Sequence, residues 1–71
     1  MFDRITFDPK IMGGRACIRG MRIPVSVIVS HIADGATFEE VLGEFPSLER
    51  EDLRQALGYA AALTRDEVIA S

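Results

Sequence analysis

Apolar and polar positions alternate near the start of the chain and predict a half-buried strand there. Between Arg4 and Asp8, Ile5 and Phe7 fall on one face and the polar residues fall on the other. A turn is expected directly afterwards, because Pro9 fixes φ and the Asp8 side chain can accept hydrogen bonds from nearby backbone N–H groups. The N-terminal residues thus predict one strand that ends in a turn.

The sequence GGRACIRGMRIP, residues 13–24, predicts a hairpin that leads into a helix. Short runs at 15–18 and 21–23 flank Arg19-Gly20, and a two-residue connection that ends in glycine suits a turn with positive φ. Pro24 suits the first turn of a helix, because its fixed φ and missing N–H are tolerated there. The hairpin is therefore expected to connect directly to the first helix.

After Pro24 the apolar period changes from two residues to 3.6 and predicts three helices. The positions that recur with helical spacing are Val25, Ile28, Val29 and Ile32 in the first helix, Phe38, Val41, Leu42 and Phe45 in the second, and Leu53, Ala56, Leu57 and Ala60 in the third. Each helix therefore has one apolar face that must be buried.

Local signals set the ends of these helices. Gly35 is a natural C-cap for the first helix, and Thr37 with Glu40 forms a capping box that starts the second. The third helix is expected over about residues 49–64. Gly58 lies inside it at a cost of about 1 kcal/mol relative to alanine, so a close helix crossing is expected there.

The second and third helices are joined by about four residues, with a first helix that can cover both. This arrangement predicts a mainly α fold: a three-helix, homeodomain-like helix-turn-helix body with an N-terminal β-hairpin arm. We expect a single domain over residues 1–71, divided into a β arm with a basic hairpin at 1–24, the three-helix body at 25–64 and a polar tail at 65–71.

Size and composition predict that this domain associates with something else. A chain of 71 residues buries only about 60% of its unfolded surface, yet 48% of its residues are apolar. We therefore expect a homodimer or a complex with another protein, with the Ile5/Phe7 strand and residues 60–63 as contacts. The alternative is a well-packed monomer.

Cysteine usage and hydropathy predict a cytoplasmic protein. The one cysteine, Cys17, excludes an internal disulfide, and with His31 as the only histidine there is no Cys/His cluster for zinc. Charges occur within the first ten residues, and no uncharged run approaches about 18 residues, so neither a signal peptide nor a membrane span is expected.

Charge is distributed unevenly along the chain. The net charge of −3 argues against nucleic-acid binding by the molecule as a whole. Residues 1–30, however, hold five basic and two acidic side chains, a net +3, whereas residues 31–71 hold three basic and nine acidic, a net −6. The sequence therefore predicts a basic patch on an acidic body.

Catalytic and metal-binding patterns are weak. Cys17 and His31 are the obvious candidates for a nucleophile and a base, but they are expected on different elements with no third group to orient the base. The acids Glu39, Glu40 and Glu44 are more typical of a solvated helix face than of a metal site. We expect no enzymatic activity, no metal and no cofactor.

Three arginines of the arm are the better candidates for function. Arg15, Arg19 and Arg22 fall on one small ribbon, and guanidinium groups are forked donors for carboxylates and phosphates. They are the predicted partner-binding residues. The alternative is a solvated strand face whose arginines pair with the acidic body.

The third helix offers an ambiguous nucleic-acid interface. Arg50 and Arg54 lie four residues apart on one face and could contact phosphates or a guanine edge. Glu49, Glu51 and Asp52 occupy the same first turn, where they favour the helix N-terminus and repel a DNA backbone. The sequence therefore leaves two interpretations open: a helix that contacts DNA through Arg50 and Arg54, and a helix that does not contact DNA.

The segments GGRACIRGMRIPVSVIV and IADGATFEEVLGEFPSLEREDLRQALGYAAAL together resemble a known family. Their order of GG, IRG, RIP and a tri-helical ending is similar to domain of unknown function 433 (DUF433), which is grouped with VapB-like antitoxins. The resemblance covers residues 4 to about 67. It implies a helix-turn-helix fold with an N-terminal β arm, a bacterial toxin–antitoxin role, and a PIN-like ribonuclease, encoded beside the protein, as partner.

The function expected from these observations is that of an antitoxin-like module in a type II toxin–antitoxin system. It would neutralise a PIN-like ribonuclease by placing an arginine in the acidic, metal-holding pocket of that enzyme, and as a dimer it would bind operator DNA. Two alternatives stay open: a stand-alone helix-turn-helix regulator, and a small structural subunit of a larger complex.

Overall fold

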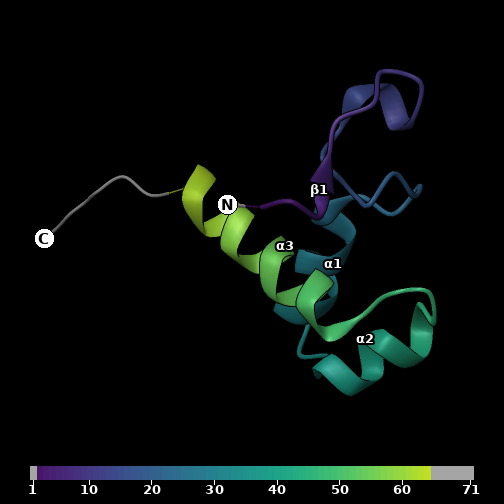
Figure 1. The fold of residues 1–71 in the computed structure, drawn as a ribbon. Coiled ribbons are helices and arrows are strands. Elements are labelled where there is room, and N and C mark those ends of the chain that lie inside the picture. Colours follow the sequence, from purple (N-terminus) through teal and green to yellow (C-terminus); the bar gives the residue numbers. More distant parts are fainter. Residues whose placement is uncertain (1, 65–71) are drawn as a thin grey trace, which may run out of the picture.

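The computed structural model describes residues 2–64, which form a small, mainly helical domain. An N-terminal hairpin of two antiparallel strands precedes three helices (Figure 1). The elements in chain order are β1 (Ile5–Thr6), the 3-10 helix η1 (Met12–Gly14), β2 (Cys17–Ile18), α1 (Val25–Ala33), α2 (Phe38–Glu44) and α3 (Arg50–Leu63). Within the described residues no helix is both long and apolar enough to cross a membrane.

The predicted turn at Arg19-Gly20 is confirmed. Both residues have positive φ, 45° at Arg19 and 72° at Gly20. The Met21 N–H donates to the Ile18 carbonyl oxygen at 2.8 Å and closes the turn. Two successive positive φ values are typical of the turn that best matches the twist of a hairpin.

The strand pairing around this turn differs from the prediction. Cys17–Ile18 pairs with β1, with Ile5 opposite Ile18 and Thr6 opposite Cys17, so the expected strand at 21–23 is wrong. After the turn only an isolated bridge between Cys17 and Pro24 forms. On either side of this bridge the Ile18 N–H donates to the Ile23 carbonyl oxygen at 3.0 Å and the Val25 N–H donates to the Ala16 carbonyl oxygen at 2.9 Å. Because proline has no N–H and α1 begins at Val25, the pairing extends no further.

The predicted helix ends are confirmed for α1 and α2. Gly35, with φ of 100°, follows α1, and its N–H donates to the Ile32 carbonyl oxygen at 3.0 Å. At the start of α2 the Glu40 N–H donates to Thr37 Oγ1 at 3.1 Å, and the Thr37 N–H donates to Glu40 Oε1 at 2.8 Å. These bonds satisfy groups that a helix leaves without internal partners.

The core is assembled from both strands and all three helices. Its buried apolar side chains are Ile5, Ile18, Val25, Ile28, Val41, Leu48, Leu53 and Ala56. Ile5 is 7% exposed and belongs to this core, so it is not the surface residue that the expected dimer contact at Ile5 requires. Phe7 is 55% exposed and remains on the surface.

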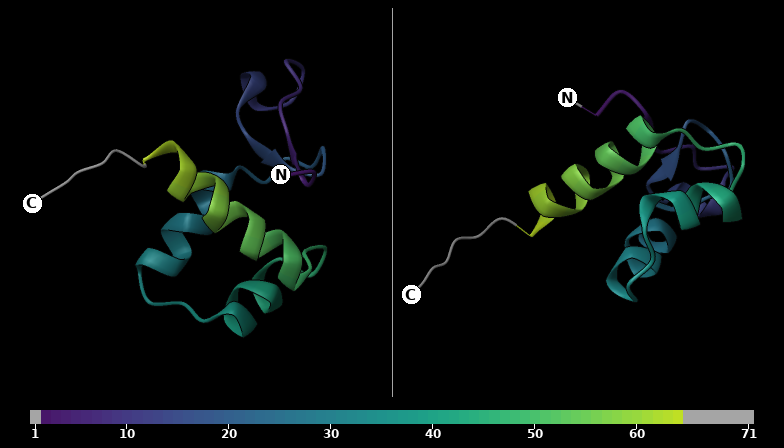
Figure 2. Two further views of the ribbon diagram at one scale, coloured as in Figure 1. Left: turned by 60° about the vertical axis from the view of Figure 1, so that its left-hand side comes forward. Right: turned by 90° about the horizontal axis from the view of Figure 1, so that it is seen from below.

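The close approach at Gly58 also has a different origin from the one expected. A Cβ atom at Gly58 would lie 3.0 Å from Cε1 of Phe2, so the neighbour is the N-terminal aromatic ring and not another helix. Phe2 also packs edge-on against Tyr59, with ring centroids 5.9 Å apart. The segment before β1 therefore lies along α3, whose C-terminal turn extends beyond the rest of the described molecule (Figures 1 and 2).

Candidate functional site

A cluster of charged residues joins the arm to the start of α3. Arg19 Nε donates to Asp52 Oδ1 at 3.0 Å, and its Nη2 donates to Asp52 Oδ2 at 2.8 Å. Arg4 Nη1 donates to the same carboxylate at 3.0 Å and to Glu49 Oε1 at 2.6 Å. We call Arg4, Arg19, Glu49 and Asp52 the Asp52 cluster.

Asp52 is the centre of this cluster and is fully buried. Its Oδ2 also accepts the backbone N–H of Glu49 at 2.8 Å, which satisfies one free donor at the N-terminus of α3. Burial alone raises the pKa of Asp52, but the hydrogen bonds from Arg19, the Glu49 backbone and Arg4 outweigh it and hold the pKa below its usual value. The carboxylate is therefore ionised at neutral pH and fully paired.

Arg19 thus has an internal role in the free protein. Besides Asp52, its guanidinium donates to the Ser47 carbonyl oxygen at 2.9 Å, so all three bonds join the hairpin turn to the α2–α3 connection and α3. These bonds also raise the pKa of Arg19, chiefly through the hydrogen bonds to Asp52. Of the three arginines predicted to bind a partner, Arg19 is therefore already bound to groups within the domain.

The other two arm arginines, Arg15 and Arg22, are both exposed. Neither forms an ion pair with another residue in the described range 2–64. The neighbours of Arg22, Met21 and Ile23, pack against the core, so its backbone is held while its side chain reaches solvent. The structure therefore separates the predicted trio into one internal and two surface residues.

Arg50 and Arg54, predicted to contact DNA, lie on the surface of α3 and are each paired with an acid. Arg50 Nη1 lies 2.8 Å from Glu39 Oε2, and its guanidinium stands over the Phe38 ring at 5.3 Å from the centroid. Arg54 donates two bonds to Glu51, at 2.9 and 2.7 Å. These bonds hold the pKa of Glu51 down at about 2.

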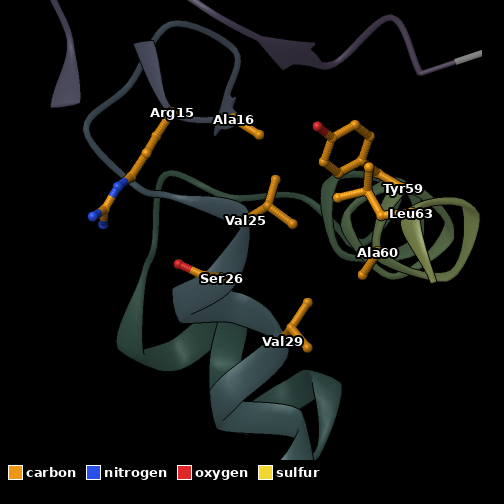
Figure 3. A pocket seen from close by; sticks show the side chains of 8 residues that line it. All are labelled: Arg15, Ala16, Val25, Ser26, Val29, Tyr59, Ala60 and Leu63. Carbon is orange, nitrogen blue, oxygen red and sulfur yellow. The ribbon is translucent and has the colours of Figure 1, made fainter. Parts of the chain in front are cut away.

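A hollow of about 630 Å³ lies between the start of α1 and the C-terminal half of α3. Val25 and Val29 of α1 point across it toward α3 (Figure 3). Arg15 and Ala16 of the arm border it at one end, and the Arg15 guanidinium points away from its centre (Figure 3). The lining is mostly apolar and consists of Arg15, Ala16, Val25, Ser26, Val29, Tyr59, Ala60 and Leu63.

The residues considered for catalysis lie apart. Cys17 is 2% exposed, in β2, whereas His31 lies in the last turn of α1 with its ring edge-on to Phe45, at 5.4 Å between centroids. Residues 2–64 bring together no group of three or more His, Cys, Asp or Glu side chains that could hold a metal ion. The best candidate for a functional site is therefore the arm with its arginines, together with the adjoining hollow.

Sequence reasoning missed the role of Asp52 and the hollow at Tyr59. In the sequence analysis Asp52 was placed in the first helical turn with Glu49 and Glu51 and was given no internal partner, although it lies four residues before Ala56 and directly before Leu53. Residues four apart share a helix face, so its position beside the apolar stripe was a detectable signal. The hollow depends on how α1 crosses α3, which no local pattern encodes.

Comparisons with known proteins give a family and two similar chains. The sequence profile of the family described as "Protein of unknown function (DUF433)" matches residues 5–60. Uncharacterized protein y4eO of Sinorhizobium fredii (strain NBRC 101917 / NGR234) is 40% identical over 58 residues, which are 82% of this chain and 26% of that protein. The chain thus spans about a quarter of this curated relative.

A solved structure has the same fold. The crystal structure of a DUF433 member protein from Anabaena variabilis ATCC 29413 superimposes with a TM-score of 0.79 at 38% sequence identity. The match covers 84% of this chain and 59% of the other.

Proposed function

This chain belongs to the DUF433 family, and we propose that it is an antitoxin-like module that binds and neutralises a PIN-like ribonuclease in a type II toxin–antitoxin system. In this proposal the module binds its partner and catalyses no reaction. The buried thiol of Cys17 and the packed ring of His31 support a binding role over a catalytic one.

The observation that most supports the proposal is the exposure of Arg22 on a backbone that the core holds in place. Arg22 is an exposed arginine without an ion pair among residues 2–64, on a segment whose flanking residues are packed into the domain. Arg19, three residues earlier, fixes the turn by binding Asp52. A guanidinium presented from a fixed backbone loses little freedom on binding and can pair bidentately with a carboxylate.

The chemistry of the proposed partner matches this feature. PIN-like ribonucleases hold their metal ions with clustered carboxylates, so an arginine inserted there meets its preferred ligand and competes with the metal ion. Arg22 is the residue assigned to this contact. Arg19 holds the turn that precedes Arg22 in place through its ion pair with Asp52. Breaking that pair would leave the buried carboxylate with fewer partners, so the turn resists movement.

We also propose that the helices form a tri-helical helix-turn-helix. α2 ends at Glu44 and α3 begins at Arg50, with α1 packed against both. Operator binding through Arg50 and Arg54 has weaker support, because both guanidiniums are already paired with acids. A salt titration tests it: phosphate-driven binding of operator duplex falls by orders of magnitude from low to moderate salt, and binding that ignores salt contradicts it.

The nuclease proposal is tested by binding and by a matched pair of variants. The PIN-like ribonuclease encoded beside this chain is purified, and its affinity for wild-type, Arg22→Ala, Arg22→Glu and Arg54→Ala chains is measured by calorimetry. Arg54 is an exposed arginine like Arg22 but is already bound to Glu51, so it serves as the control. We expect loss of about tenfold or more for both Arg22 variants and little change for Arg54→Ala. Equal affinities for all four chains contradict the assignment.

A further inference from the structure

The outer edge of β1 presents backbone groups that have no partner in the sheet. The Ile18 N–H donates to the Ile23 carbonyl oxygen, away from β1, so Ile18 and Ile5 lie opposite each other without exchanging hydrogen bonds. Such pairs alternate with bonded pairs in an antiparallel ladder, so the backbone groups of Ile5 and Phe7 point away from β2. The Ile5 N–H donates to the Phe2 carbonyl oxygen at 3.1 Å. The Ile5 C=O and the Phe7 N–H and C=O form no hydrogen bond with the backbone of the other described residues, so β1 is an open edge.

The sequence along this edge is complementary to itself. From Arg4 to Asp8 it is RITFD. Antiparallel pairing of two copies about Thr6 places Arg4 of each copy opposite Asp8 of the other, and it places Ile5 opposite Phe7. Opposite charges and aromatic–β-branched pairs both stabilise a sheet when they lie directly across from each other. A second copy therefore fits this edge in charge and in side-chain type.

Both charged residues have groups that can make this pairing. Asp8 is exposed and forms no ion pair with the other described residues. Arg4 binds Glu49 and Asp52 through Nη1, which leaves Nη2 and Nε to donate to a further carboxylate. The Arg4 side chain is 28% exposed. The pair between copies therefore forms without breaking the Asp52 cluster.

Hydrogen bonding and charge together select one register. Residues that face outward must pair with residues that face outward, so the pairing is centred on Ile5, Thr6 or Phe7. Centring it on Ile5 requires the Ile5 N–H, which is already bound within the chain. Centring it on Phe7 places Arg4 opposite Lys10, two like charges. Centring it on Thr6 joins opposite charges and allows a ladder bond from the Phe7 N–H of each copy to the Ile5 C=O of the other.

We infer that this protein forms a two-fold homodimer in which β1 of each copy pairs antiparallel with β1 of the other, centred on Thr6. The two hairpins then form one continuous sheet, and each copy contributes the same residues. The segment that carries Arg22 lies on the other side of β2, where Ile23 accepts the Ile18 N–H, so it stays free. The inference does not depend on the proposed ribonuclease partner.

Sedimentation equilibrium of the full chain measures this association. The contact consists of two ladder bonds and a few cross-strand pairs, so we expect a reversible dimer with a Kd on the order of 100 μM. Phe7→Pro removes the N–H that each ladder bond needs and should leave a monomer at up to about 1 mM. Leu63→Asp changes another exposed apolar residue and should dimerise like wild type. Circular dichroism shows that each variant folds.

Three outcomes of that experiment overturn the inference: a wild-type monomer at about 1 mM, a dimer that survives Phe7→Pro, or a dimer that Leu63→Asp disrupts as strongly as Phe7→Pro does. The last of these would place the contact on α3.

A charge-matched pair of variants tests the cross-strand ion pair. Asp8→Lys places like charges opposite each other twice in the dimer, so we expect the Kd to rise about tenfold or more. Asp34→Lys makes the same change in net charge at another exposed acid, after α1, and should leave the Kd within about twofold of wild type. Equal effects of the two substitutions would contradict the pairing of Arg4 with Asp8.

Nuclear magnetic resonance tests the register. In a mixture of isotope-labelled and unlabelled chains, filtered spectra detect only contacts between copies. Two Thr6 residues in a non-bonded pair have Cα atoms about 4.5 Å apart, so we expect a strong contact between their Hα atoms. A contact of Thr6 with Arg4 or with Asp8 of the other copy in its place would show a different register. That result, or no contact between copies at β1, overturns the inference.

Discussion

Arg19 and Asp52, 33 positions apart in the chain, form a two-bond ion pair in which Nε and Nη2 of the guanidinium donate to separate carboxylate oxygens at 3.0 and 2.8 Å. The carboxylate is fully buried and the arginine side chain is 37% exposed. This pair joins the arm to the helical body. It therefore couples the position of Arg22, on the far side of the turn, to the position of α3.

Removing Asp52 should destabilise the whole domain. Asp52→Ala leaves Arg4 and Arg19 without their shared partner and frees the Glu49 N–H at the start of α3. Since both arginines retain access to water, we expect a loss of about 2–4 kcal/mol in the free energy of unfolding. Urea denaturation measures it. Glu39→Ala, which breaks only the exposed pair with Arg50, is the control and should cost less than about 1 kcal/mol.

Arg19 and Arg22 should respond differently to the same substitution. Arg19→Lys keeps the charge but loses the forked geometry that binds both oxygens of Asp52, so we expect about 1–2 kcal/mol of destabilisation. Arg22 forms no ion pair with the other described residues, so Arg22→Lys should stay within about 0.5 kcal/mol of wild type. Thermal and urea unfolding of the two variants would show equal effects if Arg19 were merely a surface charge.

Acid should weaken the fold through Asp52 and Glu51. Arg54 and Gln55 hold the pKa of Glu51 at about 2 in the folded chain, and the pKa of Asp52 is also lowered, despite its burial, by Arg19, the Glu49 backbone and Arg4. Both carboxyls bind protons more readily when unfolded, so their stabilisation is present above the unfolded pKa values near 4. It is lost as pH falls through the lowered folded pKa values, of which that of Glu51 is about 2. Asp52→Asn should flatten this dependence. An unchanged slope in unfolding experiments between pH 5 and 2 would contradict the role of Asp52.

Gly58 and Phe2 should be energetically coupled. Gly58→Ala favours the helix by about 1 kcal/mol, but its Cβ would approach the Phe2 ring at 3.0 Å, which offsets the gain. We expect Gly58→Ala to be nearly neutral in the wild-type chain and to stabilise a Phe2→Ala chain by about 1 kcal/mol. A double-mutant cycle from urea denaturation gives this coupling directly, and additive effects would show that the ring does not restrict position 58.

The helices were predictable because their signals act within one turn. Thr37 and Glu40 exchange backbone bonds three residues apart, and Gly35 ends α1 by adopting a φ that few other residues tolerate. The glycine at position 20 likewise permits the predicted turn. In each case the interacting groups are close in sequence, so the residue types alone are enough to predict the helix end or the turn.

Strand pairing and the Asp52 cluster were not predictable in the same way. The choice of β1 over residues 21–23 as the partner of β2 depends on the burial of Ile5 and Ile18 against the helices. Arg4 and Asp52 lie 48 residues apart, and only the packing of the arm on α3 brings them together. The sequence shows the charge of Arg19 and leaves open whether it binds a partner or the acidic body. It does not identify Asp52 as the acid that binds Arg19, because that pairing depends on how the arm packs on α3.

The most direct test of the proposed function uses the PIN-like ribonuclease that the proposal places beside this chain, and measures its cleavage of RNA while the chain is titrated into the reaction. The account predicts that wild-type chain and the Arg54→Ala control abolish cleavage at about one chain per nuclease, and that Arg22→Glu, folded by circular dichroism, needs about tenfold more protein or more. Cleavage that continues undiminished with excess wild-type chain, or full inhibition by Arg22→Glu at the wild-type ratio, would contradict it.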